Sequence, residues 1–364
     1  MSWQESTLGA ECELYQPKTL AKNELNESGL YKVYGANGVI GTHSEFNHED
    51  SQLLVTCRGA TCGTINISEP MSWINGNAMV VKPRKGNLDL MFLRHYLHHL
   101  DISKAITGAA QPQITRQSLA PIEIKFPPLE EQKRIAQILD KAAEIKAKRE
   151  LAIAKLDELA TNIFEETISH SSTSEALGAL CDVRDGTHDS PKYTTEGYPL
   201  ITSKNIVHGK IDKSTVNLVS EEDYNEICKR SKVSYGDILM PMIGTIGNPV
   251  IVEELEPKFA IKNVALIKFH KNSPQNTYIN AFLKSKQFHQ YVSSVSRGGT
   301  QKFLGLGDIR KLEIPQISQE LADKFCQQMQ VIRWLREKAI KQSIEINRLT
   351  ASLQHQAFTT GFSA

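Results

Sequence analysis

The sequence has little excess charge of either sign. Its 364 residues include 42 Lys and Arg against 41 Asp and Glu, so the formal net charge is +1. This balance argues against a protein that holds nucleic acid by a strong basic field of its own. If the chain contacts DNA, a partner must supply much of the phosphate binding.

Paired cysteines, long apolar runs and targeting signals are also scarce. Of the six cysteines only Cys57 and Cys62 lie close together, without the second pair that a zinc site requires. We therefore expect reduced thiols, no metal site and a cytoplasmic location. The start, MSWQESTLGAE, lacks the basic and apolar parts of a signal peptide. No apolar run reaches the ~18 residues that span a bilayer, so we expect no membrane partner.

Catalytic motifs are missing as well. The sequence contains no Gly-x-x-x-x-Gly-Lys-Ser/Thr phosphate loop, no His-Glu-x-x-His motif and no serine nucleophile elbow. Asn248-Pro249 is followed by Val250, so the Asn/Asp-Pro-Pro-aromatic loop with which adenine methyltransferases hold a flipped base is absent. The sequence predicts a binding and scaffolding protein with no catalytic residues and no cofactor of its own.

The chain does contain an internal repeat. Segment 108–124, GAAQPQITRQSLAPIEI, recurs in outline 190 residues later as 298–314, GGTQKFLGLGDIRKLEI. The Leu-Gly-Ala of residues 8–10 recurs at 177–179, an offset of 169. The second copy therefore carries 21 extra residues (190 minus 169) between these landmarks. We expect two copies of one module that differ most in their middle parts.

A long segment with a heptad pattern follows each copy. No Gly or Pro interrupts residues 129–167, where apolar residues recur at alternating steps of three and four. The positions 190 residues later are again mostly apolar. This pattern is typical of a coiled coil, so we expect two long antiparallel helices that bury one seam between them. The predicted seam consists of Ile135, Ile138, Ile145, Leu156, Leu159, Ile163, Phe325, Ile332, Leu335, Ile346, Leu349 and Leu353.

The predicted fold is α/β with two long helices and a pseudo-two-fold repeat. Short apolar runs such as LLVTCRG and DILMPMIG predict strands in the part before each helix. We expect an α/β domain at 1–126, a central long helix at 127–170, a second α/β domain at 171–314 and a C-terminal long helix at 315–364. Two similar heads at a fixed separation suit two half-sites on a duplex, about 34–36 Å apart.

The sequence resembles the specificity subunits of type I restriction–modification systems. The run PPLEEQKRIAQILDKAAEIKAKRELAIAKLDELATNIFEE (127–166) is similar to their central helix. VRDGTHDSPKYTTEGYPLITSKNI (183–206) and YGDILMPMIGTIG (235–247) also resemble the family, and the order of domain, helix, domain, helix matches over the whole chain. The chain is somewhat short for the family, and its first domain lacks the Gly-Thr-His stretch of the second.

The resemblance implies that the two α/β domains are target-recognition domains and that the chain is the DNA-specificity subunit. Each domain would read one half of a bipartite, asymmetric double-stranded DNA target, and the paired helices would set the spacing. Two modification subunits would dock on the helices and carry S-adenosylmethionine and the adenine-N6 methylation. Two restriction subunits would carry ATP and Mg. The chain would then be non-catalytic by itself, and phage defence through DNA methylation and restriction would be its role.

Candidate DNA contacts follow from residue type and position. Lys and Arg suit phosphates, Arg, Asn and Gln suit base edges, and a turn-rich loop adds further candidates. Gln111 in the first copy and Gln301 in the second occupy equivalent positions, which favours a shared structural or phosphate role for these two glutamines. The candidates are Arg58, Asn75, Asn77, Lys82, Arg84, Lys85, Gln111, Gln113 and Arg116 in the first domain, and Arg184, Thr187, His188, Lys192, Tyr193, Lys204, Asn205, Asn263, Arg297, Gln301 and Lys302 in the second.

Two other interpretations stay open. A specificity subunit of a related fused methyltransferase–nuclease system would share the domains and the helices, and only its native partners would distinguish it. A coiled-coil adaptor that binds proteins alone would leave the loop candidates unused and would show no DNA sequence preference. An autonomous nuclease or methylase is disfavoured because the catalytic motifs are missing.

Overall fold

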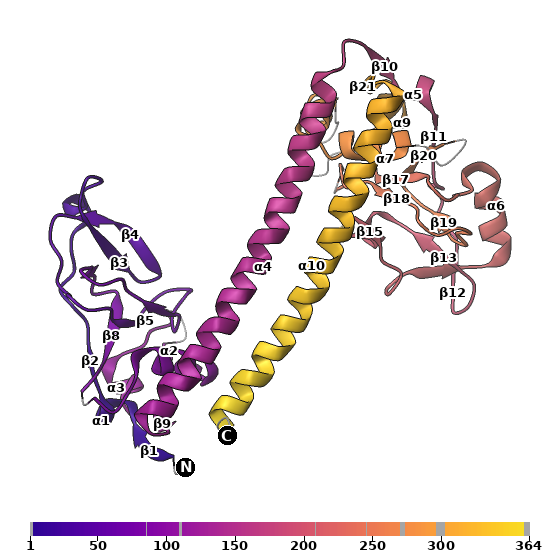
Figure 1. Cartoon of the computed structure of the whole chain (residues 1–364). Coiled ribbons are helices and arrows are strands. Elements are labelled where there is room, and N and C mark those ends of the chain that lie inside the picture. Colours follow the sequence, from indigo (N-terminus) through magenta and orange to yellow (C-terminus); the bar gives the residue numbers. More distant parts are fainter. Residues whose placement is uncertain are drawn as a thin grey trace. The chain divides into compact units, whose positions relative to one another are not determined.

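The computed structural model describes residues 3–84, 86–108, 111–207, 209–244, 246–269, 274–295 and 303–359. The chain divides into two compact units. Unit 1 takes its residues from 1–150 and 341–364, and unit 2 comprises 151–340. The boundaries fall inside the two long helices, α4 (Leu129–Ser169) and α10 (Gln319–Thr359) (Figure 1). Each unit therefore consists of one α/β domain and about half of each helix.

The main sheet of unit 1 has four antiparallel strands in the order β2-β8-β5-β6. Its strands are β2 (Cys12–Tyr15), β8 (Ala78–Pro83), β5 (Leu53–Thr56) and β6 (Ile65–Ile67). Strand β5, LLVT, is buried along its whole length because both of its faces are covered. Its sheet packs on α2 (Leu90–His99), whose N-cap Asp89 accepts hydrogen bonds from the backbone N–H groups of Met91 and Phe92.

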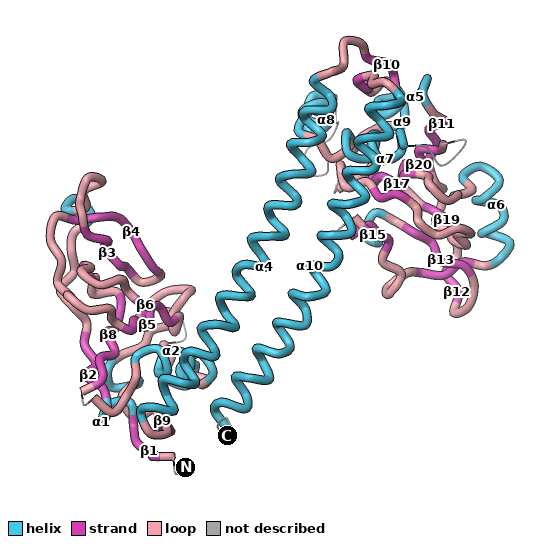
Figure 2. The backbone as a smooth tube through the Cα atoms, in the orientation of Figure 1, coloured by secondary structure: helices cyan, strands magenta, loops and turns pink. Residues whose placement is uncertain are grey.

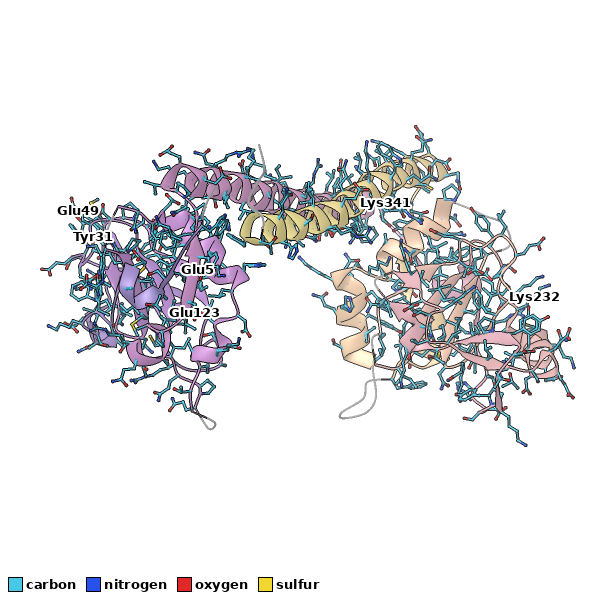
Figure 3. The ribbon with its side chains drawn as sticks, turned by 90° about the horizontal axis from the view of Figure 1, so that it is seen from below. Glu5, Tyr31, Glu49, Glu123, Lys232 and Lys341 are labelled. Carbon is cyan, nitrogen blue, oxygen red and sulfur yellow. The ribbon has the colours of Figure 1, made fainter. Side chains whose placement is uncertain are left out.

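A smaller sheet and several short elements complete unit 1. This smaller sheet has the strand order β4-β3-β7, in which β3 is antiparallel to β4 and parallel to β7. Strands β1 and β9 pair antiparallel and bring the start and end of the domain together; Glu5 and Glu123 lie on them (Figure 3). The elements are β1 (Gln4–Thr7), α1 (Leu8–Glu11), η1 (Lys22–Glu24), β3 (Tyr31–Gly35), β4 (Gly38–His43), β7 (Trp73–Ile74), η2 (Ile102–Ala105), α3 (Arg116–Leu119) and β9 (Glu123–Phe126).

Unit 2 repeats this plan (Figure 2). Its main sheet has the order β11-β20-β17-β18, again antiparallel, and in its second sheet, β12-β16-β13-β19, the β13–β19 pair is parallel. Strands β10 and β21 pair as β1 and β9 do. The strands are β10 (Ser174–Ala176), β11 (Asp182–Asp185), β12 (Tyr193–Thr194), β13 (Tyr198–Ile201), β14 (Ile206–Val207), β15 (Lys210–Ile211), β16 (Asn217–Val219), β17 (Ile238–Pro241), β18 (Val250–Ile251), β19 (Ala260–Ile261), β20 (Val264–Lys268) and β21 (Glu313–Pro315).

The helices of unit 2 include one that unit 1 lacks at the equivalent point, α6. This helix lies between β16 and β17 and accounts for much of the extra length of the second copy. Ser220 caps it by accepting from the backbone N–H of Asp223 at 3.1 Å. The short helices are α5 (Leu177–Leu180), η3 (Ser203–Asn205), α6 (Glu221–Ser231), α7 (Pro274–Phe282), α8 (Lys286–Val295) and α9 (Leu306–Arg310).

Strand register shows that the repeat continues through the divergent middle of each copy. Val81 pairs with Leu14 on one side and Leu53 on the other, and Ile267 pairs in the same way with Val183 and Ile238. The helices α4 and α10 both have 41 residues and are offset by 190 at both ends. The predicted fold class, two α/β domains with two long helices and an internal repeat, is confirmed.

Within each unit the two long helices pack against each other in opposite directions. In unit 1 the start of α4 meets the end of α10, where Ile135, Leu139 and Ala357 share the core of the domain. In unit 2 the end of α4 meets the start of α10, where the rings of Phe164 and Phe325 lie 6.1 Å apart. In each unit the largest buried cluster thus combines the main sheet, short helices and the helix pair.

A heptad seam uses two positions in every seven residues. In the long helices the first of these is buried as predicted, whereas the second lies at a different residue from the predicted one. Ile135, Phe325 and Ile332 are buried, and Ile138, Leu156, Ile163, Ile346 and Leu353 are half-buried. The prediction of a buried seam is wrong for Ile145, Leu159, Leu335 and Leu349, which are 39%, 46%, 39% and 60% exposed. The next residue is less exposed in each case, so the second seam position lies one residue later; its members are Leu139, Lys146, Ile153, Ala160, Met329, Arg336, Ser343 and Thr350.

A physical reason explains this one-residue error. Periodicity assigns every regularly spaced apolar residue to the interface, whereas the side chains that fill a close helix contact are here often small or polar, such as Ala160 and Ser343. The displaced apolar residues stay on the surface beside the seam. No helix in the described part of the chain is long and apolar enough to cross a membrane.

Candidate DNA-recognition surface

In unit 2 the segment after strand β11, residues 186–192, forms a loop held against the turn before β20. We call it the recognition loop. The backbone N–H of Gly186 donates to Val264 O at 3.0 Å, and that of Thr187 donates to Ile261 O at 3.0 Å. A Cβ at Gly186 would lie 2.3 Å from Ile261 O, so only glycine permits this approach. The loop is therefore fixed to the sheet by its backbone.

Side chains fix the same loop a second time. His188 Nε2 lies 2.7 Å from Asp185 Oδ2, and His188 Nδ1 lies 2.8 Å from Asn263 Oδ1. The other Asp185 oxygen pairs with Arg230 on α6. The Asp185 side chain is only 7% exposed, whereas those of His188 and Arg230 are 55% and 63% exposed. A buried carboxylate thus anchors two exposed basic side chains.

In unit 1 the structure brings Arg58, Asn77 and Gln113 together. Arg58 and Gln113 form a β-bridge, and the backbone N–H of Cys57 donates to Asn77 O at 3.1 Å. All three predicted contacts are exposed. They lie at the start of β8, which corresponds to the start of β20 in unit 2, where Asn263 lies. The two units therefore offer polar side chains at the same place in the fold.

Lys82 and Arg84 lie away from this group, since β8 separates Asn77 from Lys82 by roughly 16 Å at about 3.3 Å per residue. Lys82 instead lines a cavity of about 590 Å³ together with Tyr15, His48 and Trp73. Tyr15 Oη lies 2.8 Å from His48 Nε2. Burial, and to a lesser extent the charge of Lys82, lowers the pKa of His48. This ring is therefore neutral near pH 7 and adds no charge to the surface.

The remaining predicted contacts fall into three groups. Most are exposed, and Arg184, Thr187 and Asn263 are half-buried. Lys85, Arg297, Gln301 and Lys302 lie outside the described residues. The other exposed candidates are Lys82, Arg84, Gln111, Arg116, Lys192, Tyr193 and Lys204.

Burial contradicts the prediction that Asn75 and Asn205 contact bases. Asn75 is 5% exposed and its amide bonds the backbone N–H and O of Leu20, at 2.8 and 3.3 Å. Asn205 is 6% exposed and its amide bonds Thr202 N and Asp212 O. Both amides are used inside the protein, so the prediction that they read bases is wrong. Residue type alone cannot distinguish an amide that closes a loop from one that faces solvent.

Arg184 has a structural use as well. Its Nε donates to Asp182 Oδ2 at 2.7 Å, and its Nη1 donates to the carbonyl of Arg230 near the end of α6 at 2.9 Å. Lys268 Nζ donates in the same way to the carbonyl of Lys232, the residue that follows α6 (Figure 3), at 2.8 Å. These cations hold the C-terminal end of α6 on the main sheet.

The sequence did not indicate Asp185, Arg230 or Lys262 as parts of the surface. Lys262 Nζ donates to Ser190 Oγ at 2.7 Å and so also fixes the recognition loop. Asp185 and Arg230 are 45 residues apart in the chain, so only the folded structure brings them together. No group of three or more His, Cys, Asp or Glu side chains that could hold a metal ion occurs among the described residues.

The two units thus define a class of protein: two related α/β modules with different polar loops, joined through a shared pair of long helices. Comparison with known proteins agrees. Residues 1–155 match the family model of the type I restriction modification DNA specificity domain. A putative type I restriction enzyme specificity subunit of Haemophilus influenzae is 24% identical over 84% of this chain and 82% of its own length. The EcoprrI specificity subunit of Escherichia coli is 32% identical over 32% of this chain and 28% of its own length.

A solved structure supports the fold over the whole chain. The type I restriction-modification S subunit from M. genitalium aligns with a TM-score of 0.69 at 17% identity and covers 98% of this chain and 96% of its own. The chain is thus similar to type I restriction enzyme specificity subunits, by the family model over its first 155 residues and by a relative over most of its length. The matched family model, which describes a DNA specificity domain, covers the first α/β domain and the start of α4.

Proposed function

We propose that unit 1 and unit 2 each read one half of a bipartite, asymmetric DNA target and that the paired helices set the spacing between the halves. The observation that carries this proposal is the repeated topology with unlike side chains at equivalent positions. By strand register Asp185 and His188 correspond to Gln16 and Thr19, an offset of 169. Two modules with one frame and different polar groups suit two different half-sites.

We further propose that the helices dock two modification subunits. Each unit carries one equivalent pair of exposed apolar residues beside the seam: Ile145 and Leu349 in unit 1, Leu335 and Leu159 in unit 2. The offset of 190 relates 145 to 335 and 159 to 349. Exposed apolar side chains that recur in this way suit two copies of one partner.

The chemistry of the complex lies on these partners in our proposal. Modification subunits would bind S-adenosylmethionine and methylate adenine N6, and two restriction subunits would use ATP and Mg. Their basic surfaces would supply the phosphate binding that a chain with a net charge of +1 lacks. The complex would act in the cytoplasm, where its DNA substrate lies.

The test of this function uses the chain co-expressed with the methyltransferase subunits of its host. The purified complex is presented with a randomised DNA library, and methylated molecules are sequenced. We expect two blocks of preferred bases separated by a spacer of fixed length. No preference would favour the adaptor interpretation, and a nuclease fused to the co-purified methyltransferase would favour the related fused system.

The docking proposal has a matched pair of variants. Leu159→Asp with Leu335→Asp places charge on the exposed pair of unit 2, and Ile145→Asp with Leu349→Asp does so in unit 1. Because all four residues are exposed, stability should change by only about 0.5 kcal/mol each. Each double variant should lose one modification subunit, measured by native mass spectrometry. Retention of two subunits by both variants would contradict the proposed surface.

A further inference from the structure

The turn that carries Asn263 has an unusual and well-fixed backbone. Asn263 has a φ of +54°, in the left-handed region, where asparagine is one of the few residues other than glycine that occur with any frequency. Its backbone N–H donates to Thr187 O at 3.2 Å, and Thr187 N donates to Ile261 O. The recognition loop and the turn therefore hold each other in place. Such a backbone gives the attached side chain a defined direction.

A chain of contacts then orients the Asn263 side chain. Arg230 pairs with Asp185, Asp185 contacts His188 Nε2 at 2.7 Å, and His188 Nδ1 contacts Asn263 Oδ1 at 2.8 Å. The imidazole thus contacts the oxygen end of the amide. No residue in the described part of the chain forms a hydrogen bond with its other end, the amide nitrogen Nδ2. This nitrogen can still donate two hydrogen bonds.

The surroundings of this amide suit DNA better than a purely structural role. A histidine that only supports a core is buried, whereas the His188 side chain is 55% exposed. Lys192, four residues later in the same loop, is exposed, and Arg230 is 63% exposed although it pairs with Asp185. Cations around a fixed polar group match the division of labour in DNA interfaces, where phosphate contacts position the protein and a few side chains reach base edges.

We propose that Asn263 reads one base of the half-site bound by unit 2 and that His188 and Asp185 are positioning residues for its amide. This inference rests on the proposed function and names the residue that carries part of the specificity. A donating amide nitrogen recognises an acceptor in the major groove, such as purine N7, guanine O6 or thymine O4. In unit 1 the equivalent residue is Asn77, but Thr19 and Gln16 replace the histidine and the carboxylate.

The first test exchanges the donor for an acceptor. Asn263→Asp keeps the shape of the side chain and tolerates a positive φ. In the methylation selection described above, it should change the preferred base at one position of one half-site, from an acceptor base to cytosine, whose N4 donates. We expect a change of about tenfold at that position. Asn263→Gly, which removes the amide without backbone strain, should relax the same position by a similar factor.

The second test separates positioning from contact. His188→Ala and Asp185→Asn should relax the same single position, and His188→Ala should add little in the Asn263→Gly background because the amide it positions is gone. Asn225→Ala, at an exposed asparagine on α6, is the matched control and should leave all positions unchanged. Melting temperatures of all variants check that the chain folds.

The outcomes distinguish this inference from the proposed function. If the wild-type complex selects no bipartite sequence, the proposed function fails. If the wild type selects one and the Asn263 variants fold but keep every base preference, or lose affinity evenly at all positions, the assignment of Asn263 as a base reader is refuted. If the Asn263 variants change the base preference but the His188 and Asp185 variants do not, the positioning role of His188 and Asp185 is refuted.

Discussion

At the end of strand β11 unit 2 has a buried aspartate, an exposed histidine and an inserted helix that donates an arginine. At the equivalent end of β2, unit 1 has Gln16 and Thr19, and its described residues between β4 and β5 form no inserted helix. The sheets behind these residues have the same strand order and register. The comparison teaches that the frame of the module is set by apolar strands, whereas the surface chemistry depends on a few positions that the frame leaves free.

The units also differ in how they hold the long helices. Unit 2 uses aromatic rings: Phe164, Tyr278 and Phe325 lie about each other with centroids 6.0 to 6.1 Å apart. Unit 1 also packs rings, with Phe92 and Tyr96 of α2 at 5.9 and 5.4 Å from Phe358 of α10. It adds Gln132, which is fully buried and whose repeat equivalent is Ala322. The ring contacts depend on shape and area, whereas the Gln132 contact, which unit 2 lacks at the equivalent position, depends on hydrogen bonds. The predictions below test that difference.

Removal of the aromatic contact should have the largest effect. Phe325 is 0% exposed, so Phe325→Ala leaves a cavity and should lower the free energy of unfolding by about 3–5 kcal/mol. Hydrogen exchange should increase in residues 151–340 more than in unit 1. Gln327→Ala, at an exposed site of the same helix, is the control. Equal loosening of both units would contradict the assignment of this cluster to unit 2.

Removal of Gln132 should have the next largest effect, and in unit 1. Its Nε2 donates to Asn87 O and Pro127 O at 2.8 Å each, and its Oε1 accepts from Asp89 N at 2.9 Å. Gln132→Ala leaves these groups without partners and should cost roughly 2–4 kcal/mol. Urea unfolding measures this loss, with Gln137→Ala as the exposed control. A loss below that of the control would show that water replaces the amide.

Acid should weaken unit 1 through its histidines. Burial lowers the pKa of His95, opposed by its contact with Asp140, and burial also lowers the pKa of His48 and His98. The unfolded chain then binds more protons than the folded unit as the pH falls through about 6.5, so stability decreases in that direction. In Trp334→Phe the remaining tryptophans, Trp3 and Trp73, report on unit 1 alone. Their urea midpoint should fall between pH 7.5 and 5.5.

A variant of His95 sharpens this prediction. His95 is 6% exposed, and its Nε2 lies 2.8 Å from Asp140 Oδ1. His95→Gln in the Trp334→Phe background cannot titrate, so its midpoint should fall less over the same pH range. An unchanged pH dependence would assign the effect to other groups of the unit.

The smallest effect concerns one exposed ion pair. Arg336 Nε lies 2.6 Å from Asp157 Oδ1, and both side chains are about half exposed, so Arg336→Ala should cost only about 0–1 kcal/mol. The equivalent positions in unit 1 hold Lys146 and Asn347. Asn347→Asp should create a similar pair there with a gain no larger. Both changes are measured by urea unfolding in low salt and in 0.5 M salt. The difference in the free energy of unfolding between variant and wild type should be smaller in 0.5 M salt.

The architecture could be predicted because its signals are local or repeated. Proline before α4, an uninterrupted run of helix formers and a constant offset of 190 defined both long helices before any contact was known. The choice of residues that form the buried seam could not be predicted in the same way. Apolar residues such as Leu159 and Leu349 lie beside the seam, and only packing decides between positions one residue apart.

The site was less predictable because it joins distant parts of the chain. His188 and Asn263 could be suggested by residue type, but their contact spans 75 residues, and Asp185 gave no signal at all. Asn75 and Asn205 have amide side chains of the kind that can bind base edges, but both are buried and hydrogen-bonded inside the protein. Burial and hydrogen bonding, which decide whether an amide is free, depend on neighbours far away in sequence.

The most direct test of the account is a map of methylated adenines across the host genome with and without this gene. We expect one class of methylated site to disappear on deletion, with two unlike blocks of specific bases separated by a fixed non-specific spacer. Return of the unmodified gene should restore both blocks. A single contiguous block, two identical blocks or no change in methylation would contradict the claim that the two units read different half-sites.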